Sequence, residues 1–196
     1  MNRAFFFDRD GVLNYGVYRY NEEHRRYRDS APLNVNELRL NEYAKEVIKN
    51  VKDKGFIPIV VTNQPDFLKR DISLRDYEKI TTQFCQHLEL ERSHIFECLH
   101  REGYSLECGC RKPKPGLFFM AKGFYDLDMR NSWMIGDSFT DIEAARNAGV
   151  GTSVFCRVPH IKGVSAGNEE EEKKLAENSL SPNFFINDLS EVIKLI

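Results

Sequence analysis

Short apolar runs alternate with stretches of helical periodicity, and this alternation is the feature that most constrains how the chain folds. Ala4–Phe7 and Phe56–Val61 are apolar on both faces, as expected of strands buried in a parallel sheet. Between them, residues 41–54 place apolar side chains at helical spacing, and Gly55 supplies a stop. The pattern predicts an α/β fold in which a Rossmann-like parallel sheet carries helices on both faces.

The same pattern continues along residues 1–196, which we expect to form a single domain. Further strands are predicted at 94–98, 132–135, 151–155 and 183–186, and further helices at 73–88, 117–125, 138–148 and 189–196. Ser73 is a typical helix N-cap, and Ser138 with Asp141 resembles a capping box. Two segments fall outside the alternation. Segment 15–40 is polar, aromatic and rich in arginine, and the glutamate run within 163–181 indicates a solvated surface excursion.

Charge and hydropathy disfavour several classes of protein. The formal net charge of -2 supplies no basic field for a nucleic acid. The longest apolar runs are far too short to span a membrane, and the N-terminal residues lack the apolar core of a secretory signal. We therefore expect a cytoplasmic monomer whose partner is a small molecule, with no nucleic-acid partner and no membrane association.

Polar clusters stand at the ends of three predicted strands: Asp8-Arg9-Asp10-Gly11, Thr62-Asn63-Gln64 and Gly136-Asp137-Ser138. Ligands of open parallel sheets sit beyond the carboxyl ends of the strands. Turns also favour Asp, Asn, Gly and Ser, so any single cluster is explained about equally well by turn formation. Three clusters together, two of them with carboxylates, favour a functional site.

The carboxylates of these clusters indicate a cation site. Asp8 and Asp10 lie two residues apart, so an extended backbone would point both side chains the same way. Asp137 could add an oxygen from another strand, and Mg²⁺ prefers such ligands. Gly11 permits the turn to approach a ligand closely. The sequence thus predicts Mg²⁺ at Asp8, Asp10 and Asp137, and it contains no P-loop of a nucleotide hydrolase.

Four soft ligands gather in one short segment: Cys98, His100, Cys108 and Cys110. Three thiols and one imidazole suit tetrahedral Zn²⁺, and four protein ligands would make the zinc structural. The spacing differs from common zinc fingers, which leaves reduced, unligated thiols as the alternative. Arg111 and Lys112 follow Cys110 directly, so a zinc-stapled loop would also aim these two cations.

The motifs together resemble the haloacid dehalogenase superfamily of phosphohydrolases. Its four signatures occur in order as Asp8-Arg9-Asp10-Gly11-Val12, Thr62, Lys112, and Gly136-Asp137-Ser138 with Asp141. The resemblance implies that Asp8 attacks phosphorus and that Asp10 first protonates the leaving oxygen and then activates water. It implies that Mg²⁺ is held by Asp8, Asp137 and the Asp10 carbonyl, and that Thr62 and Lys112 neutralise the phosphoryl oxygens. Asp141, with Ser138 beside it, is expected either to start a helix or to support the metal from a second layer.

The cysteine segment resembles that of the heptose bisphosphate and histidinol phosphatase branch of this superfamily, which lacks a large cap domain. In the heptose branch the residue matched by Arg111 recognises substrate. Asn63 and Gln64 match the residues after the threonine, and the resemblance implies that they bind substrate as well. The resemblance implies hydrolysis of the 7-phosphate of a heptose 1,7-bisphosphate, in the supply of heptose for lipopolysaccharide. Histidinol phosphate is the alternative substrate.

Two departures from that branch leave the substrate open. Residues 65–70 differ from the usual continuation, and segment 15–40 is longer than expected. Segment 15–40 is either a solvated surface loop or a substrate loop whose arginines grip a second phosphate: Arg19, Arg25, Arg26 and Arg28. A catalytically idle binding module with the same fold is a further alternative, but it would be expected to lose Asp8, Asp10 or Lys112, and all three are present.

Overall fold

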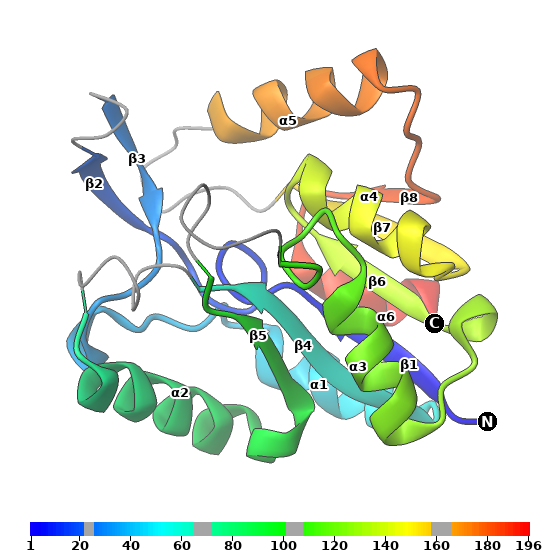
Figure 1. Cartoon of the computed structure of the whole chain (residues 1–196), viewed down its shortest axis with the longest axis horizontal. Coiled ribbons are helices and arrows are strands. Elements are labelled where there is room, and N and C mark those ends of the chain that lie inside the picture. The colour runs from blue at the N-terminus through cyan, green and yellow to red at the C-terminus, as the bar shows by residue number, and fades with distance from the viewer. Residues whose placement is uncertain (22–25, 65–71, 101–107, 158–165) are drawn as a thin grey trace.

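The computed structural model describes the backbone of residues 1–21, 26–64, 72–100, 108–157 and 166–196. Six parallel strands form the main sheet in the order β5-β4-β1-β6-β7-β8, and β2 and β3 form a separate antiparallel hairpin (Figure 1). The strands are β1 (Arg3–Phe7), β2 (Val17–Asn21), β3 (Arg26–Ser30), β4 (Phe56–Asn63), β5 (Ile95–Cys98), β6 (Trp133–Gly136), β7 (Thr152–Cys156) and β8 (Phe184–Ile186). The helices are α1 (Ala44–Asp53), α2 (Leu74–Leu88), α3 (Gly116–Tyr125), α4 (Phe139–Ala148), α5 (Ala166–Glu177) and α6 (Val192–Leu195).

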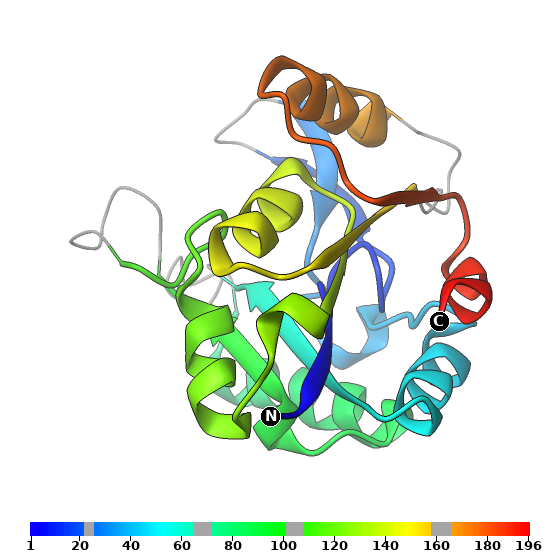
Figure 2. The same ribbon diagram turned by 90° about the vertical axis from the view of Figure 1, so that its right-hand side faces the viewer.

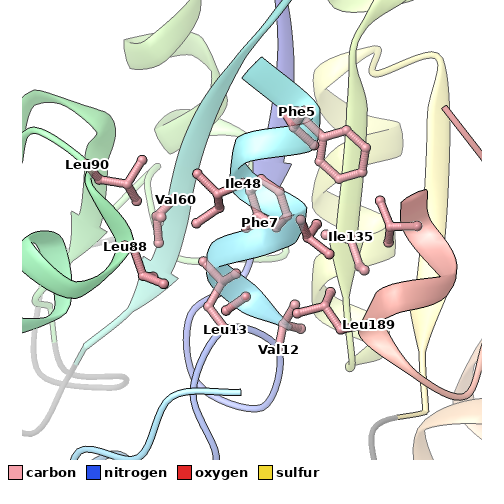
Figure 3. Close-up of a cluster of buried hydrophobic side chains, with 14 of the residues drawn as sticks. Phe5, Phe7, Val12, Leu13, Ile48, Val60, Leu88, Leu90, Ile135 and Leu189 are labelled. Carbon is pink, nitrogen blue, oxygen red and sulfur yellow. The ribbon is translucent and has the colours of Figure 1, made fainter. Parts of the chain in front are cut away.

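Helices cover both faces of the sheet, as predicted, and the alternation of side chains along β1 explains why. Phe5 and Phe7 lie in a core with apolar residues of α1, α2 and α6 (Figure 3). Phe6 points the other way, into a second core formed with α3 and α4. Seen from the side, the sheet separates α3 and α4 from α1 and α6 (Figure 2). Within the described residues, no helix is both long enough and apolar enough to cross a membrane.

The strands and helices that the alternation predicts are all present, with bounds that differ by a few residues. Ser73 caps α2 by accepting from the backbone N–H of Asp76, and Ser138 and Asp141 form the predicted capping box of α4. The last predicted helix is a 3-10 turn at Leu189–Glu191 followed by α6.

The β2–β3 hairpin and α5 are not predicted by the residue pattern. The hairpin lies in segment 15–40, and α5 lies within 163–181, where only a solvated excursion was expected. Leu175 of α5 is buried with Ile142 and Phe155, so among the side chains described for this helix one apolar residue, within an acidic stretch, packs against the domain. A single buried leucine gives no helical periodicity to detect.

The sheet register brings the three polar strand ends together. Phe7 of β1 pairs with Val60 of β4 on one side and with Ile135 of β6 on the other. The residues that follow these positions therefore emerge side by side at the carboxyl edge of the central strands. The hairpin and α5 lie at the same end of the molecule (Figures 1 and 2).

Candidate active site

Three carboxylates and one lysine form a centre at this edge, called here the carboxylate centre: Asp8, Asp141 and Lys112, which are buried, and Asp137, which is half-buried. The three aspartates bring oxygens within 4.8 Å of one another. Lys112 Nζ donates to Oδ1 of Asp8 at 2.6 Å and to Oδ1 of Asp141 at 2.5 Å. It also donates to the Val61 carbonyl at 2.8 Å, which fixes the ammonium against the end of β4. The predicted convergence of Asp8, Asp137 and Lys112 is therefore observed.

The electrostatics of this centre show a deficit of positive charge. Burial raises the pKa of Asp8 to about 7 despite the nearby Lys112 ammonium. Burial and the neighbouring Asp8 and Asp141 also raise the pKa of Asp137 well above its usual range. Burial would lower the pKa of Lys112, but Asp141 and Asp8 outweigh it and raise that pKa, so Lys112 is a stable cation. One ammonium faces three carboxylates, a donor set that fits a hard divalent cation such as Mg²⁺.

Gly11 fits closely against the carboxylate centre. Its φ is +103°, and a Cβ built on it would lie 2.0 Å from Oδ2 of Asp137. The turn after β1 can therefore approach the Asp137 carboxylate only because residue 11 has no side chain. The close approach predicted at Gly11 is made to a candidate metal ligand.

Asp10 lies apart from the carboxylate centre, which differs from the expectation that its side chain points the same way as that of Asp8. The chain turns at Arg9, so the alternation of an extended strand does not continue to Asp10. The Asp10 carboxylate accepts instead from Asn14 Nδ2 at 2.9 Å and pairs with Arg9, with Nε 3.3 Å from Oδ2. Gln64 Nε2 also donates to Asp10 Oδ2. Metal binding through the Asp10 carbonyl, as the resemblance implies, stays a prediction.

The three residues at the end of β4 have separate contacts. Thr62 is buried, and its Oγ1 accepts from Gln64 Nε2 at 2.9 Å. Asn63 makes two hydrogen bonds with the backbone of Lys112: Oδ1 accepts from the N–H at 3.0 Å, and Nδ2 donates to the carbonyl at 3.2 Å. Gln64 is also buried. Asn63 and Gln64 are thus committed to protein groups, although the resemblance implies substrate binding for both.

Asp141 performs a capping role and a charge-pairing role with its two oxygens. Oδ2 accepts from the Ser138 hydroxyl at 2.6 Å and from the Ser138 N–H at 3.1 Å, which starts α4. Oδ1 faces Lys112 within the carboxylate centre. The two roles expected for Asp141, starting a helix and supporting a metal site, are therefore compatible.

The four soft ligands also come together and form what is called here the thiol cluster: Cys98, His100, Cys108 and Cys110. Cys98 Sγ lies 3.8 Å from Cys108 Sγ and 3.3 Å from Cys110 Sγ. His100 Nδ1 lies 3.5 Å from Cys98 Sγ and 3.2 Å from Cys110 Sγ. Tetrahedral Zn²⁺ with Zn–S bonds of about 2.3 Å separates its ligand atoms by roughly 3.5–3.8 Å, so this arrangement fits zinc with only small adjustments.

The surroundings of the thiols also suit a cation. Burial works to raise the pKa of Cys108, but the backbone N–H groups of Arg111 and Cys110 outweigh it and lower that pKa. Burial raises the pKa of Cys98 to about 12, so this thiol holds its proton until a metal binds, and metal binding would release that proton to solvent. The Lys112 ammonium is directed at Asp8 and Asp141 and so does not offset the charge of the thiolates. Arg111 is half-buried and follows Cys110 directly in the chain.

Other residues named from the sequence are only partly described. Arg19 of the hairpin pairs with Glu37 at 2.8 Å and donates to the Ala31 carbonyl at 3.1 Å. Arg25 and residues 65–70 lie outside the described residues, and Arg26 and Arg28 are described by their backbone in β3 alone. Arg9 is the largest fully buried side chain of the described residues, although the residue pattern assigns it no role. Its only sequence signal is its place between Asp8 and Asp10.

Comparison with known proteins identifies the family of this chain. The family model described as haloacid dehalogenase-like hydrolase matches residues 16–149, and a second, described as HAD-hydrolase-like, matches residues 109–192. D-glycero-beta-D-manno-heptose-1,7-bisphosphate 7-phosphatase of Vibrio cholerae is 32% identical over 162 residues, covering 79% of this chain and 81% of that protein. D-glycero-alpha-D-manno-heptose-1,7-bisphosphate 7-phosphatase of Campylobacter jejuni is 30% identical over 157 residues, covering 78% and 81%.

A solved structure shares the fold over almost the whole length. The D,D-heptose 1,7-bisphosphate phosphatase of B. bronchiseptica, complexed with magnesium and phosphate, superposes with a TM-score of 0.76 at 22% identity, covering 98% of this chain and 97% of that one. The family models match most of the chain, and the named relatives are phosphatases. This chain belongs to the haloacid dehalogenase-like hydrolase family.

Proposed function

We propose that the protein is a Mg²⁺-dependent phosphatase that removes the 7-phosphate of D-glycero-D-manno-heptose 1,7-bisphosphate. The observation that carries the chemistry is the carboxylate centre, in which Asp8 lies against the buried Lys112 ammonium and within reach of Asp137 and Asp141. The relatives named as heptose bisphosphate phosphatases support the substrate.

In the proposed reaction Asp8 attacks phosphorus and becomes an aspartyl phosphate, while the bond to the sugar oxygen breaks. Asp10 delivers a proton to that oxygen and later takes one from the water that hydrolyses the acyl phosphate. Lys112 is held beside Asp8 by three acceptors, so its charge is in place before the substrate arrives. Thr62 Oγ1 accepts from Gln64, which leaves the hydroxyl proton to be donated to a phosphoryl oxygen.

We assign the Mg²⁺ ligands to Asp8, Asp137 and the Asp10 carbonyl, with Asp141 behind them. When bound, the ion supplies positive charge to phosphoryl oxygens and offsets the crowded carboxylates. We assign Zn²⁺ to the thiol cluster as a structural ion, because all four ligand positions are taken by protein atoms. Reduced thiolates of this kind suit the cytoplasm, which keeps cysteines reduced.

The substrate proposal also assigns roles around the carboxylate centre. Arg111 would contact the sugar phosphate, and the β2–β3 hairpin would cover the bound substrate, because it lies at the end of the sheet where the carboxylates meet (Figure 1). Arg19 is paired with Glu37, so the hairpin does not offer this guanidinium as an unpaired anion binder. The two relatives named above differ in the anomer that they act on, and the assay below distinguishes the two.

The test is a phosphate-release assay with and without Mg²⁺. Its substrates are both anomers of D-glycero-D-manno-heptose 1,7-bisphosphate, histidinol phosphate and common sugar monophosphates. We expect Mg²⁺-dependent turnover with the highest kcat/KM on one heptose bisphosphate anomer. A preference for histidinol phosphate would keep the chemistry but change the substrate. Asp8→Asn should abolish activity while leaving zinc content and the melting temperature intact, and a fully active Asp8→Asn would overturn the nucleophile.

A further inference from the structure

A buried arginine stands between the two catalytic aspartates without belonging to the proposed chemistry. Arg9 is 1% exposed, and its guanidinium carbon lies 5.9 Å from the centre of the Phe84 ring on α2. Taking a guanidinium out of water is costly unless its hydrogen bonds are replaced. Arg9 uses Nε against Asp10 and donates from Nη2 to Gln64 Oε1 at 3.1 Å. These two partners offset part of the cost of burial, while Nη1 is buried without a hydrogen-bond partner among the described residues.

The Gln64 side chain can have only one orientation between its partners. Arg9 has donors alone, so it must face the amide oxygen of Gln64. The Asp10 carboxylate accepts when ionised, so it must face the amide nitrogen. The second hydrogen on that nitrogen goes to Thr62 Oγ1. Gln64 is 3% exposed, and its carbonyl and both of its N–H groups are thus committed to protein partners.

These contacts hold the Asp10 carboxylate from both sides. Oδ2 meets Gln64 Nε2 and Arg9 Nε, while Oδ1 accepts from Asn14 Nδ2. A carboxylate with donors at both oxygens cannot rotate without breaking hydrogen bonds. Proton transfer depends steeply on such placement, since a displacement of about 1 Å can cost a rate factor of about 100.

We propose that Arg9 and Gln64 form a buried brace that orients Asp10 for proton transfer and turns the Thr62 hydroxyl toward the substrate phosphoryl group. The two brace residues are positioning residues and act through Asp10 and Thr62. The inference rests on the proposed phosphatase function and adds to it two residues that set the efficiency of acid catalysis. It also gives Gln64 a role within the protein in place of substrate binding.

The test exploits leaving groups of different basicity. Phenyl phosphate needs a proton on its departing oxygen far more than p-nitrophenyl phosphate does, so a misplaced acid harms the former more. We expect Arg9→Met and Arg9→Lys to lower kcat/KM about 100-fold for phenyl phosphate and about tenfold or less for p-nitrophenyl phosphate. Lysine keeps the charge but cannot bond Asp10 and Gln64 with one planar fork, so it should not rescue.

Gln64→Glu supplies an isosteric second variant in case the arginine variants fold poorly. It keeps an oxygen for Arg9 but replaces the donors toward Asp10 and Thr62, and the same unequal loss is expected. Leu88→Ala is the matched control, because it removes core packing on α2 without removing a hydrogen bond of the brace and should leave the ratio of the two rates unchanged. Melting temperature and zinc content are measured for every variant.

The outcomes separate the brace from the proposed function. A wild-type protein that releases no phosphate from any ester with Mg²⁺ present overturns the phosphatase assignment and the brace with it. An active wild type whose Arg9 and Gln64 variants lose both activities equally, or lose neither, overturns the brace alone. Rescue by Arg9→Lys would show that the charge matters and the geometry does not, which also contradicts the proposal.

Discussion

The carboxylate centre and the thiol cluster lie close together but are constructed in opposite ways. Residues of the carboxylate centre come from positions as far apart as Asp8 and Asp141, and the sheet ladder joins the strands that carry them. The thiol cluster comes from the thirteen residues between Cys98 and Cys110, and three of its members lie beyond the end of β5. Asp8 and Asp141 are buried, whereas Cys108 and Cys110 are half-buried and His100 is exposed.

This difference indicates which of the two sites needs its ion in order to form. Hydrogen bonds of the sheet assemble the carboxylate centre, so a cation there serves charge and chemistry. Of the four cluster residues, only Cys98 lies in a described helix or strand, so an ion is expected to hold the cluster together. Asn63 joins the two, because it grips the backbone of Lys112 only two residues after Cys110.

The largest effect is expected from replacing Lys112, the buried ammonium of the carboxylate centre. Lys112→Met should lower kcat by at least about 1,000-fold, since the buried ammonium that neutralises the phosphoryl group is gone. The variant also leaves Asp8 and Asp141 buried without their partner, so its melting temperature should fall at neutral pH. Lys122→Met, at an exposed lysine of α3, is the control. Zinc content should stay at the wild-type value, and loss of zinc would contradict a thiol cluster that forms without the carboxylate centre.

Breaking the thiol cluster should have a smaller effect on the rate and a direct effect on metal content. Cys108→Ser is expected to abolish stoichiometric zinc, lower the melting temperature and reduce kcat by about 10- to 100-fold, because the loop no longer fixes Lys112. Elemental analysis and kinetics measure both. Cys85→Ala removes a thiol outside the cluster and should keep zinc and rate. An unchanged rate in zinc-free Cys108→Ser would separate the loop from catalysis.

Asn63 tests the connection between the two regions. Asn63→Ala removes both hydrogen bonds to the Lys112 backbone, so we expect kcat to fall about tenfold while KM and zinc content stay near their wild-type values. Asn178→Ala, at an exposed asparagine after α5, is the control. A rise in KM with kcat unchanged would instead assign Asn63 to the substrate, as the family resemblance implies.

How much of the fold and of the candidate site could be predicted from the sequence depended on the kind of residue pattern. The strands and the helices of the sheet layers were predictable, because runs such as Ala4–Phe7 are apolar on both faces. The meeting of Asp8 and Asp137 followed from parallel strands ending at one edge. The thiol cluster was predictable because all its ligands are local in sequence.

The remainder depended on geometry that residue patterns do not contain. The chain turns at Arg9, so Asp10 leaves the carboxylate centre, and spacing alone could not reveal this. The contacts of Asn63 and Gln64 join positions 49 and 54 residues apart, to Lys112 and Asp10. The hairpin was hidden because its strands are polar and short. Helix α5 was hidden because Leu175 alone is buried among the side chains described for it.

The smallest expected effect is the pH dependence of the stabilisation that Mg²⁺ gives at the carboxylate centre. Burial raises the pKa of Asp8 from 3.8 to about 7 in the metal-free protein. A group whose pKa is higher in the folded than in the unfolded state contributes stability that is fully present below its unfolded-state pKa. That contribution is lost as the pH rises through the folded-state pKa. Metal-free protein should therefore lose this contribution between pH 4 and 7, and Mg²⁺ should compensate for the loss because it binds the ionised carboxylates.

We accordingly expect the rise in melting temperature on adding Mg²⁺ to be near zero at pH 5 and to reach about 3–6 °C at pH 7.5, measured by differential scanning calorimetry. Asp137→Asn removes a proposed ligand and should abolish this rise without affecting zinc. The thiol cluster provides the internal comparison, since its zinc should stay bound across this pH range in both proteins. A Mg²⁺ stabilisation that does not change between pH 5 and 7.5 would contradict a proton-linked cation site, because ionisation of Asp8 would then contribute nothing to binding.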